Sequence, residues 1–319
     1  MSFSSGVKEE LSRQMSPARH CQIAEIAAIL SFCGKVNIAE DGSYSIKIHT
    51  ENVAVARKYF TLLKKAFNIG TDISIRRNAF LKKSRTYTLV IRKSEDAIRL
   101  LETTKLFDDQ VKSSESLPVV KNLIIQNTCC RRAFIRGAFL AAGSLSDPEK
   151  FYHLEIVCTS SDKAKQLQNI ITTFSIDAKI VVRKKYYVVY IKEGSQIVDM
   201  LSVMEAHVAL MELENIRILK EMRNSVNRQV NCETANISKT VSAAVKQLSD
   251  ITYIRDAVGL SYLPEALSEI AEVRLERPDA TLKELGESLE PPVGKSGVNH
   301  RLRKICAIAE TLREQRGRL

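Results

Sequence analysis

Two nine-residue segments of similar pattern, 26–34 and 135–143, constrain the fold of this chain more than any other feature. Each segment is apolar, is rich in small residues and ends in a glycine, Gly34 or Gly143. Small residues four positions apart lie on one ridge of a helix, so two such helices can approach backbone to backbone. We therefore predict a closely packed pair of helices, and the closing glycines suit left-handed helix C-caps.

The sequence after each of these segments repeats as well. Its pattern predicts a strand, a helix, two strands and a helix, so that one αββαββα-like unit occurs twice in the chain. The elements expected in the first copy are 44–50, 53–67, 73–77, 87–91 and 95–101, and those expected in the second are 154–159, 162–174, 178–183, 186–192 and 195–204. Two repeats of mixed helices and strands predict the α+β fold class.

This arrangement resembles the LAGLIDADG homing endonucleases, which implies a pseudo-two-fold axis between the two helices and two sheets that form a saddle over DNA. In that family, the acidic residue before the final glycine of each helix holds divalent metal ions, which prefer oxygen ligands. Here these positions are Cys33 and Ala142, and the nearest carboxylates, Asp41 and Asp147, lie beyond the helix ends. Alanine ligates nothing and a single thiol binds Mg²⁺ poorly. We therefore predict that the scaffold is kept, that the nuclease is lost and that neither position is catalytic.

The net charge of +11 is concentrated on the strands and their connections. Eleven basic residues accompany one acid between residues 57 and 93, and seven accompany one acid between residues 163 and 192. Such an excess is suited to tracking DNA phosphates, although exposed surfaces are often basic without a partner. The predicted phosphate contacts are Arg76, Arg77, Lys82, Lys83 and Arg85 in the first copy, and Arg183, Lys184 and Lys185 in the second.

Composition argues against a membrane or secreted protein. No apolar run approaches the roughly 18 residues of a membrane helix, and the N-terminus lacks the apolar core of a signal peptide. We therefore expect a protein of the cytoplasm.

The seven cysteines show no C-x-x-C spacing, which predicts neither a disulfide framework nor a zinc site. We interpret the adjacent Cys129 and Cys130 as buried apolar side chains, and the scattered histidines, His20 among them, as forming no recognisable group. Motifs for phosphate binding and for an activated nucleophile are missing. The sequence therefore predicts no cofactor and no metal.

The region after the second repeat changes to a purely helical pattern. Apolar residues at helical spacing predict a helix to about residue 228, polar residues at 227–236 break the pattern, and a second helix is expected from Ser238 to about Ile251. The expected parts of the chain are an N-terminal helix, the first repeat, the second repeat, a helical linker and a C-terminal domain, at 1–20, 21–110, 125–205, 206–250 and 251–319.

Residues 280–313 carry the most specific local signal after the repeat. Thr281 and Glu284 form a capping box that begins one helix, and Pro291–Pro292 within 290–294 predicts a turn. Ser296 then caps a second helix with an apolar stripe. A helix-turn-helix presents its recognition helix in this way, although a plain helical hairpin with a solvated basic face is the alternative. The predicted DNA contacts are Ser296, Asn299, His300, Arg301, Arg303 and Lys304.

A degenerate LAGLIDADG-like domain followed by an all-α helix-turn-helix domain resembles the bacterial WhiA family. The similarity covers nearly the whole chain, including 7–11, both repeats, 231–236 and 281–308. It implies a non-enzymatic DNA-binding protein that acts as a transcriptional regulator or as a factor in cell division, chromosome segregation and sporulation. The partners expected are double-stranded DNA and, as a second interaction, another transcription regulator or RNA polymerase. A residual nuclease that uses other acidic residues is the alternative, and Cys33 and Ala142 favour the non-enzymatic protein.

Overall fold

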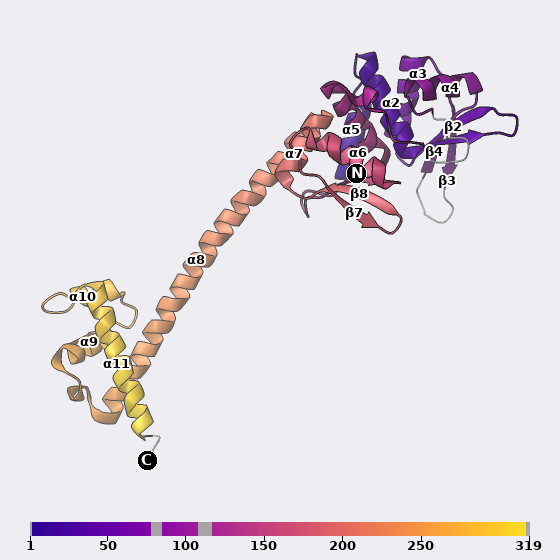
Figure 1. The fold of residues 1–319 in the computed structure, drawn as a ribbon. Coiled ribbons are helices and arrows are strands. Elements are labelled where there is room, and N and C mark those ends of the chain that lie inside the picture. The colour runs from indigo at the N-terminus through magenta and orange to yellow at the C-terminus, as the bar shows by residue number, and fades with distance from the viewer. Residues whose placement is uncertain (1, 78–84, 108–116, 317–319) are drawn as a thin grey trace. The chain divides into compact units, whose positions relative to one another are not determined.

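The computed structural model describes residues 2–77, 85–107 and 117–316 (Figure 1). The chain divides into two compact units, Met1–Lys220 and Glu221–Leu319, and each has its own buried apolar core. Of the described helices, none combines the length and the hydrophobicity that a membrane span requires.

Each repeat of the first unit forms a four-stranded antiparallel sheet. The first sheet has the order β1-β2-β4-β3, and its strands are β1 (Gly34–Ile38), β2 (Tyr44–Thr50), β3 (Asp72–Arg77) and β4 (Arg85–Ile91). The second sheet has the equivalent order β5-β6-β8-β7, and its strands are β5 (Gly143–Leu145), β6 (Leu154–Cys158), β7 (Lys179–Arg183) and β8 (Tyr186–Ile191).

Helices cover one face of each sheet, as Figure 1 shows. The first repeat contains α2 (Arg19–Cys33), α3 (Val53–Phe67) and α4 (Ser94–Thr103), and the second contains α5 (Thr128–Ala142), α6 (Ser161–Thr172) and α7 (Gly194–Met204). α1 (Phe3–Arg13) precedes the first repeat, and the short helix η2 (Asn122–Ile125) precedes α5. The predicted α+β fold with two αββαββα repeats is confirmed.

Local sequence explains these elements. In β2, the buried Ile46 and Ile48 alternate with the exposed Lys47, as expected for a strand with one covered face. Asn52 then caps α3 by accepting hydrogen bonds from the backbone N–H groups of Ala54 and Val55. The predicted elements 44–50 and 53–67 have the observed bounds, and the other predicted elements of the repeats differ by at most two residues at an end. β1 and β5 belong to the predicted αββαββα unit, but no residue range was predicted for either strand.

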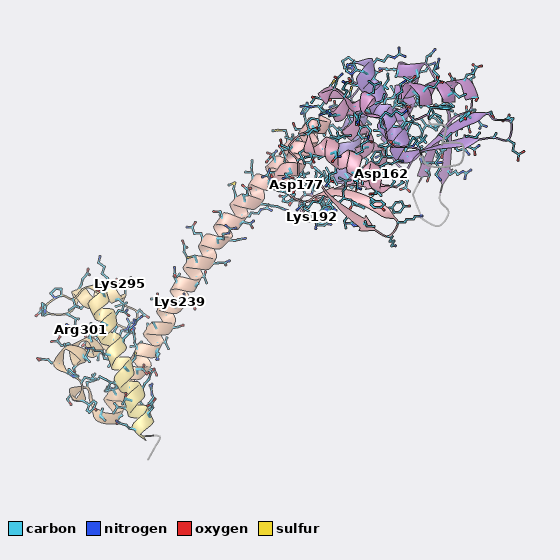
Figure 2. All side chains as sticks on the ribbon, viewed as in Figure 1. Asp162, Asp177, Lys192, Lys239, Lys295 and Arg301 are labelled. Carbon is cyan, nitrogen blue, oxygen red and sulfur yellow. The ribbon has the colours of Figure 1, made fainter. Side chains whose placement is uncertain are left out.

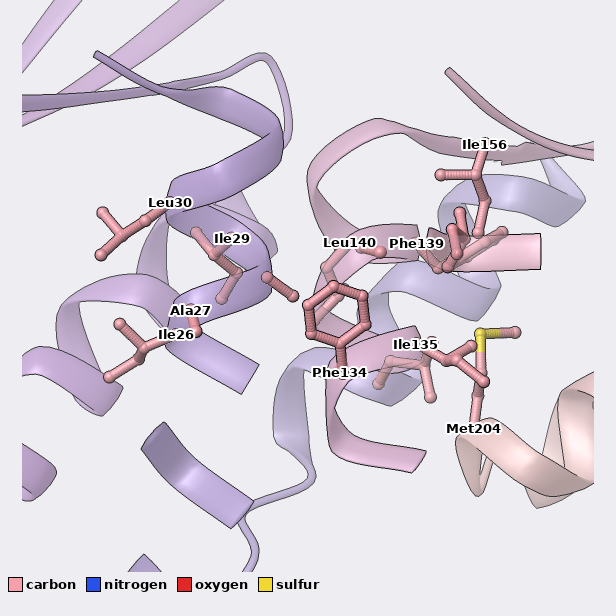
Figure 3. Close-up of a cluster of buried hydrophobic side chains, with 14 of the residues drawn as sticks. Ile26, Ala27, Ile29, Leu30, Phe134, Ile135, Phe139, Leu140, Ile156 and Met204 are labelled. Atoms are coloured by element: carbon pink, nitrogen blue, oxygen red, sulfur yellow. The ribbon is translucent and has the colours of Figure 1, made fainter. Parts of the chain in front are cut away.

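The predicted close approach of the two repeated helices is confirmed. α2 packs against α5 where Gly137 meets the backbone of Glu25, and a Cβ at Gly137 would lie only 2.5 Å from the Glu25 carbonyl oxygen. Larger apolar side chains of both helices are buried in the same core, among them Ile29 on α2 and Phe134 on α5 (Figure 3). The contact between the two helices joins the two repeats into one core.

The prediction that Gly34 and Gly143 are left-handed C-caps is wrong. Both have extended backbone, with φ of −81° and −86°, because each helix passes directly into the first strand of its sheet. Glycine is required there for space. A Cβ at Gly34 would lie 2.6 Å from the Leu30 carbonyl oxygen, and one at Gly143 would lie 2.3 Å from the Phe139 ring.

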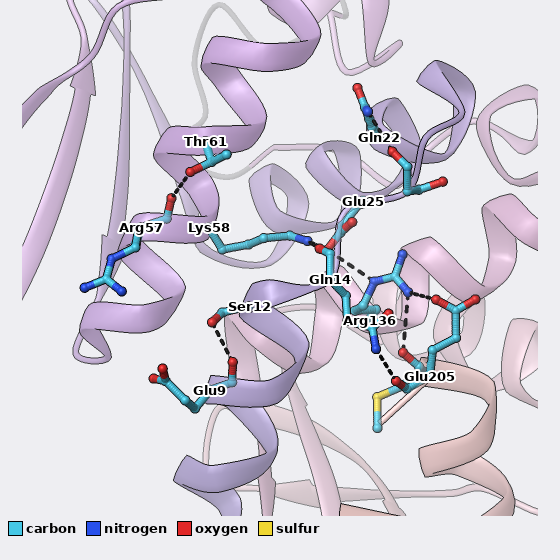
Figure 4. Close-up of polar contacts among 12 residues, drawn as sticks. Glu9, Ser12, Gln14, Gln22, Glu25, Arg57, Lys58, Thr61, Arg136 and Glu205 are labelled. Carbon is cyan, nitrogen blue, oxygen red and sulfur yellow. Dashed lines mark hydrogen bonds and ion pairs between the residues drawn. The ribbon is translucent and has the colours of Figure 1, made fainter. Parts of the chain in front are cut away.

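A buried group of charges also links the two repeats (Figure 4). The Glu25 carboxylate lies 3.2 Å from the Lys58 ammonium and 3.4 Å from the Arg136 guanidinium. Arg136 also pairs with Glu205 at 2.6 Å, and Lys58 donates to the Gln14 carbonyl oxygen. Removing one member of such a group leaves an uncompensated buried charge, so the group favours one arrangement of α2, α3 and α5.

The second unit is entirely helical. It contains the C-terminal part of α8 (His207–Val258), the short η3 (Leu260–Tyr262), α9 (Glu265–Glu276), α10 (Leu282–Glu287) and α11 (Lys295–Arg316). Its core is built from Ile251, Ile254, Ile270, Leu285, Leu302 and Ile305, which are all fully buried.

The predicted break at 227–236 is wrong, because α8 is one continuous helix. Polar residues at 227–236 are typical of a loop, but residues 207–258 contain neither proline nor glycine. Asn and Thr disfavour helix only by fractions of a kcal/mol each. The helical spacing of apolar residues continues through the exposed middle of α8, where Met222, Val226, Val230, Ile237, Val241 and Val245 are four or seven residues apart, so the polar residues between them do not end the helix.

Candidate nucleic-acid interface

α10, the turn after it and α11 form the predicted helix-turn-helix. The capping box at Thr281 and Glu284 is confirmed: the Thr281 hydroxyl accepts from the Glu284 N–H, and the Glu284 carboxylate accepts from the Thr281 N–H at 2.7 Å. The turn packs tightly on α10, since a Cβ at Gly286 would lie 2.0 Å from the Val293 carbonyl oxygen. The Val293 N–H donates back to the Gly286 carbonyl at 3.0 Å, which fixes where α11 begins.

α11 buries one stripe and exposes the opposite one. Val298, Leu302 and Ile305 are fully buried in the core of the second unit. Of the predicted DNA contacts, Ser296, His300, Arg303 and Lys304 are exposed, whereas Asn299 and Arg301 are half-buried. The four exposed residues are the ones that this face can present to a DNA groove.

Two predicted contacts on α11 differ from expectation. α11 begins at Lys295, so Ser296 lies inside its first turn and does not precede the helix as a cap. The Arg301 guanidinium donates to the Ala266 carbonyl at 3.3 Å, and therefore helps to hold α11 against α9. Lys295 and Arg301 mark the first half of α11 in Figure 2.

The C-terminal half of α11 is anchored by a buried carboxylate. Arg313 pairs with Asp250 at 2.6 Å, and its guanidinium lies over the Tyr253 ring, 4.6 Å from the ring centre. Both partners are on α8, and the Asp250 side chain is 2% exposed. These contacts make α11 a fixed part of its unit, as a recognition helix requires.

The degenerate catalytic positions lie at the C-terminal ends of α2 and α5. The Cys33 thiol donates to the Ile29 carbonyl at 3.2 Å, and burial raises the pKa of Cys33 to about 12. A neutral thiol beside Ala142 offers no ligand for a hard cation. Asp41 and Asp147 are exposed and accept hydrogen bonds from residues of their own turns. Among the described residues, no convergent group of three or more His, Cys, Asp or Glu side chains lies at this end of the helices.

The uncovered face of the first sheet is polar and basic. Strand register places its side chains in four rows: Asn37 and Ser45; Lys35, Lys47, Val90 and Asp72; His49, Thr88 and Ser74; and Thr86 and Arg76. We call this set the first-sheet face. Partial burial, together with the charges of Lys35, Lys47 and Arg76, lowers the pKa of His49. Lys47 is two residues before His49 on β2, and Lys35 lies opposite Lys47 on β1.

The uncovered face of the second sheet is largely apolar. Its equivalent rows are Ser144, Glu155, Tyr190 and Lys179; Val157, Val188 and Val181; and Tyr186 and Arg183. We call this set the second-sheet face. Glu155 pairs with Arg183 at 2.8 Å and with His153 at 3.1 Å. Partial burial favours protonation of Glu155, but its bonds to His153 and Arg183 outweigh this and lower its pKa.

The predicted phosphate contacts that the structure describes do not share one surface. Arg76 lies on the first-sheet face, whereas the exposed Arg85 shares the opposite side of β4 with Leu89 by strand alternation. Arg183 is paired with Glu155, and Lys184 and Lys185 are exposed in the turn between β7 and β8. Lys82 and Lys83, and the side chain of Arg77, lie outside the described residues.

Sequence reasoning missed Lys35 and Lys47. Both lie N-terminal to the basic region 57–93, and Lys35 lies on β1, for which no residue range was predicted. The alternation of Ile46, Lys47 and Ile48 was the available signal, because it places Lys47 on the uncovered face.

Three family models match the chain in succession. They are described as the WhiA N-terminal LAGLIDADG-like domain, over residues 19–107, the WhiA LAGLIDADG-like domain, over 131–223, and the WhiA C-terminal HTH domain, over 226–309. A probable cell division protein WhiA from Lachnoclostridium phytofermentans is 60% identical over 315 residues, covering 98% of this chain and 100% of that protein. The chain belongs to the WhiA family.

Other WhiA proteins agree in sequence and in fold. A probable cell division protein WhiA from Alkaliphilus oremlandii is 53% identical over 98% of this chain and 98% of that protein. The crystal structure of full-length DUF199/WhiA from Thermatoga maritima aligns over 98% of this chain and 99% of that chain, with a TM-score of 0.60 and 24% identity. The resemblance to the WhiA family that the sequence predicted is therefore confirmed, including the helix-turn-helix domain.

Proposed function

We propose that this WhiA-family chain is a non-enzymatic, DNA-binding regulator of bacterial cell division. The observation that carries the proposal is α11, a basic helix held rigidly behind a capped helix and a tight turn, with His300, Arg303 and Lys304 on its exposed side. Such a helix fits the major groove of B-DNA, and Arg and Lys are the side chains that most often bond guanine there.

The first-sheet face supplies a second, sequence-independent contact. Its cations suit phosphates, and its Thr, Ser and His side chains can bond the DNA backbone. Two weak modules on one chain raise affinity without new base recognition, because the second contact becomes intramolecular. Because its proposed ligand is chromosomal DNA, the protein would act in the cytoplasm, on the nucleoid.

Both relatives are named as probable cell division proteins, which supports the cell-division role. The more specific roles that we propose within this function are chromosome segregation, sporulation and direct control of transcription. A genome-wide occupancy map separates them, since sharp promoter peaks indicate a transcriptional regulator and broad signal indicates a chromosome factor. If the map shows sharp peaks, RNA polymerase or a second regulator that co-purifies with this protein would be identified as its protein partner.

The alternative is a residual nuclease that uses other acidic residues. Cys33 and Ala142 argue against it, because neither can hold Mg²⁺. Supercoiled plasmid incubated with the purified protein and Mg²⁺ or Mn²⁺ should stay intact. Cleavage that copurifies with the protein would establish the nuclease instead.

The test of α11 uses a DNA site selected from a random library by the full-length protein. Arg303→Ala should weaken binding to that site by about 1–3 kcal/mol if Arg303 contacts a base, with little change in affinity for random DNA. The melting temperature should barely move, because Arg303 is exposed. Arg255→Ala, at an exposed arginine of α8, is the matched control. Unaltered site-specific affinity in a His300→Ala, Arg303→Ala, Lys304→Ala variant would contradict the proposal.

A further inference from the structure

Four potential metal ligands converge at the N-terminal ends of α2 and α5, away from the degenerate catalytic positions. They are His20, Cys21, Cys129 and Cys130, and their ligand atoms all lie within 4.8 Å of one another. The interpretation of the cysteines as buried apolar side chains holds for Cys130 but not for the exposed Cys129. The expectation that the histidines join no group is wrong for His20.

The pseudo-two-fold repeat explains this convergence. The alignment that matches Cys33 with Ala142 also matches His20 with Cys129 and Cys21 with Cys130. Each repeat therefore contributes two adjacent residues at the same position of its helix. The close approach of α2 and α5 at Gly137 brings these first turns together, and Cys21, Ala24, Cys130 and Ala133 form one small buried cluster.

We propose that these four side chains bind one zinc ion, through three thiolates and the Nδ1 atom of His20. Nδ1 lies 3.2 Å from the Cys130 sulfur, 3.3 Å from the Cys21 sulfur and 4.0 Å from the Cys129 sulfur. Tetrahedral zinc with ordinary bond lengths separates its ligand atoms by about 3.5–3.8 Å. The observed distances bracket that range, so small rotations of the side chains complete the tetrahedron.

The ligand chemistry selects the metal class. Thiolate and imidazole are soft or borderline ligands, which prefer zinc to the hard Mg²⁺ and Ca²⁺ ions. Binding releases the protons of three thiols and leaves a site of one net negative charge. Both helices begin at the cluster, and the partial positive charge of a helix N-terminus stabilises a negative site.

Such a site would be structural. Four protein ligands fill the tetrahedron and leave no open position for a substrate. The ion would join the first turn of one repeat to the first turn of the other. It would therefore stabilise the pairing of α2 and α5, on which the placement of both sheets depends.

The first test is metal content. Untagged full-length protein, purified with reductant and without chelators, should contain one zinc per chain by elemental mass spectrometry. Replacement of zinc by cobalt should give the visible bands of tetrahedral Co²⁺ and a near-ultraviolet charge-transfer band of thiolate ligands. The proposal would be overturned if the unaltered protein, after loading with excess zinc, held no more zinc than the ligand variants. Bound iron with the absorption of an iron–sulfur cluster would overturn it as well.

The variants isolate the site from general folding. Cys129→Ser and His20→Ala change exposed side chains, so they should fold, yet each should weaken zinc binding more than about a hundredfold. Cys232→Ser, at an exposed cysteine of α8, is the control and should keep the full zinc content. A strong chelator should lower the melting temperature of the unaltered protein and of the control, but not of Cys129→Ser. Equal zinc in all variants would overturn the proposal.

A disulfide is the competing chemistry for the same cysteines. Intact mass measured without reductant distinguishes it, because each disulfide removes two hydrogens. If freshly purified protein contains no zinc and shows a mass deficit that disappears on reduction, these cysteines form a disulfide and not a zinc site.

Discussion

The two sheets of the first unit share one topology but carry different chemistry on their uncovered faces. Register matches Lys35 with Ser144, Lys47 with Glu155, and His49 with Val157. The residues that pack against helices are apolar in both sheets, as with Ile46 and Ile48 in the first and Ile156 and Val189 in the second. Packing therefore preserves the inner residues of a repeat, whereas the outer residues are free to diverge with function.

The divergence extends to the single cation that both faces share. Arg76 and Arg183 occupy equivalent positions, opposite Thr86 and Tyr186. Arg183 pairs with Glu155, whereas on the first-sheet face Lys35 lies opposite Lys47, and burial together with the charges of Lys35, Lys47 and Arg76 lowers the pKa of His49. The two halves of a pseudo-symmetric scaffold thus carry different charge on the same outer surface. We infer that the first-sheet face contacts phosphates and that the second-sheet face does not.

The largest expected effect comes from neutralising the first-sheet face. Lys35→Gln, Lys47→Gln and Arg76→Gln together should weaken binding by a similar factor on target and random DNA. That factor is up to roughly a hundredfold, since an exposed charge pair contributes at most about 1 kcal/mol. The slope of log affinity against log salt should flatten by up to about 0.9 per lost phosphate contact.

The equivalent change on the second sheet is the matched control. Lys179→Gln with Arg183→Gln should leave both affinity and salt slope nearly unchanged, because Asp177 and Glu155 already pair with these cations. Equal losses from the two sets would break the comparison and indicate a symmetric saddle.

A smaller effect should follow from releasing Arg183. Glu155→Gln removes the paired carboxylate, so the second-sheet face gains one net positive charge. Affinity for random DNA should rise, by less than about fivefold, since one exposed pair is worth up to about 1 kcal/mol. Glu149→Gln, at an exposed acid outside this face, is the control for net charge. If both variants bind random DNA more tightly by the same factor, the increase in affinity reflects the net charge of the protein and not the position of the charge on the second-sheet face.

The smallest effect concerns pH. The folded protein lowers the pKa of His49 below its ordinary value of about 6.5, so the unfolded chain binds a proton there more readily. This contribution to stability is present above about pH 6.5 and is lost as pH falls through the window down to the lowered pKa. His49→Gln should therefore make the free energy of unfolding less dependent on pH in that window, as measured by urea titration. An unchanged pH dependence would show that neither burial nor the neighbouring cations lower the pKa of His49 in the folded protein.

Sequence alone predicted the repeat, most element bounds and the exposed face of α11. These follow from local periodicity, as in the alternation of β2 and the Asn52 cap of α3. The break in α8 was wrongly predicted because polar residues disfavour helix too weakly to end it without proline or glycine. Local pattern is therefore a good guide to elements that bury one face, whereas a polar stretch alone is a poor guide to where an exposed helix ends.

Features that depend on pairing between distant segments were not predictable. The first-sheet face needs the register of four strands, and β1 is short and begins at Gly34. The cluster of His20, Cys21, Cys129 and Cys130 has no motif spacing, since its halves meet only when α2 packs on α5. Spacing rules describe ligands that share a loop, and they fail for ligands that are related by a repeat.

Photo-cross-linking of the full-length protein to duplex DNA tests this asymmetry most directly. Cross-linked peptides, identified by mass spectrometry, should come from β1, β2 and β4 of the first sheet on both target and random DNA, and from α11 most strongly on the target. Peptides of β5, β6 and β8 should be nearly absent. Cross-links from both sheets in equal number, or from α11 alone, would contradict the claim that one half of the pseudo-symmetric unit binds DNA.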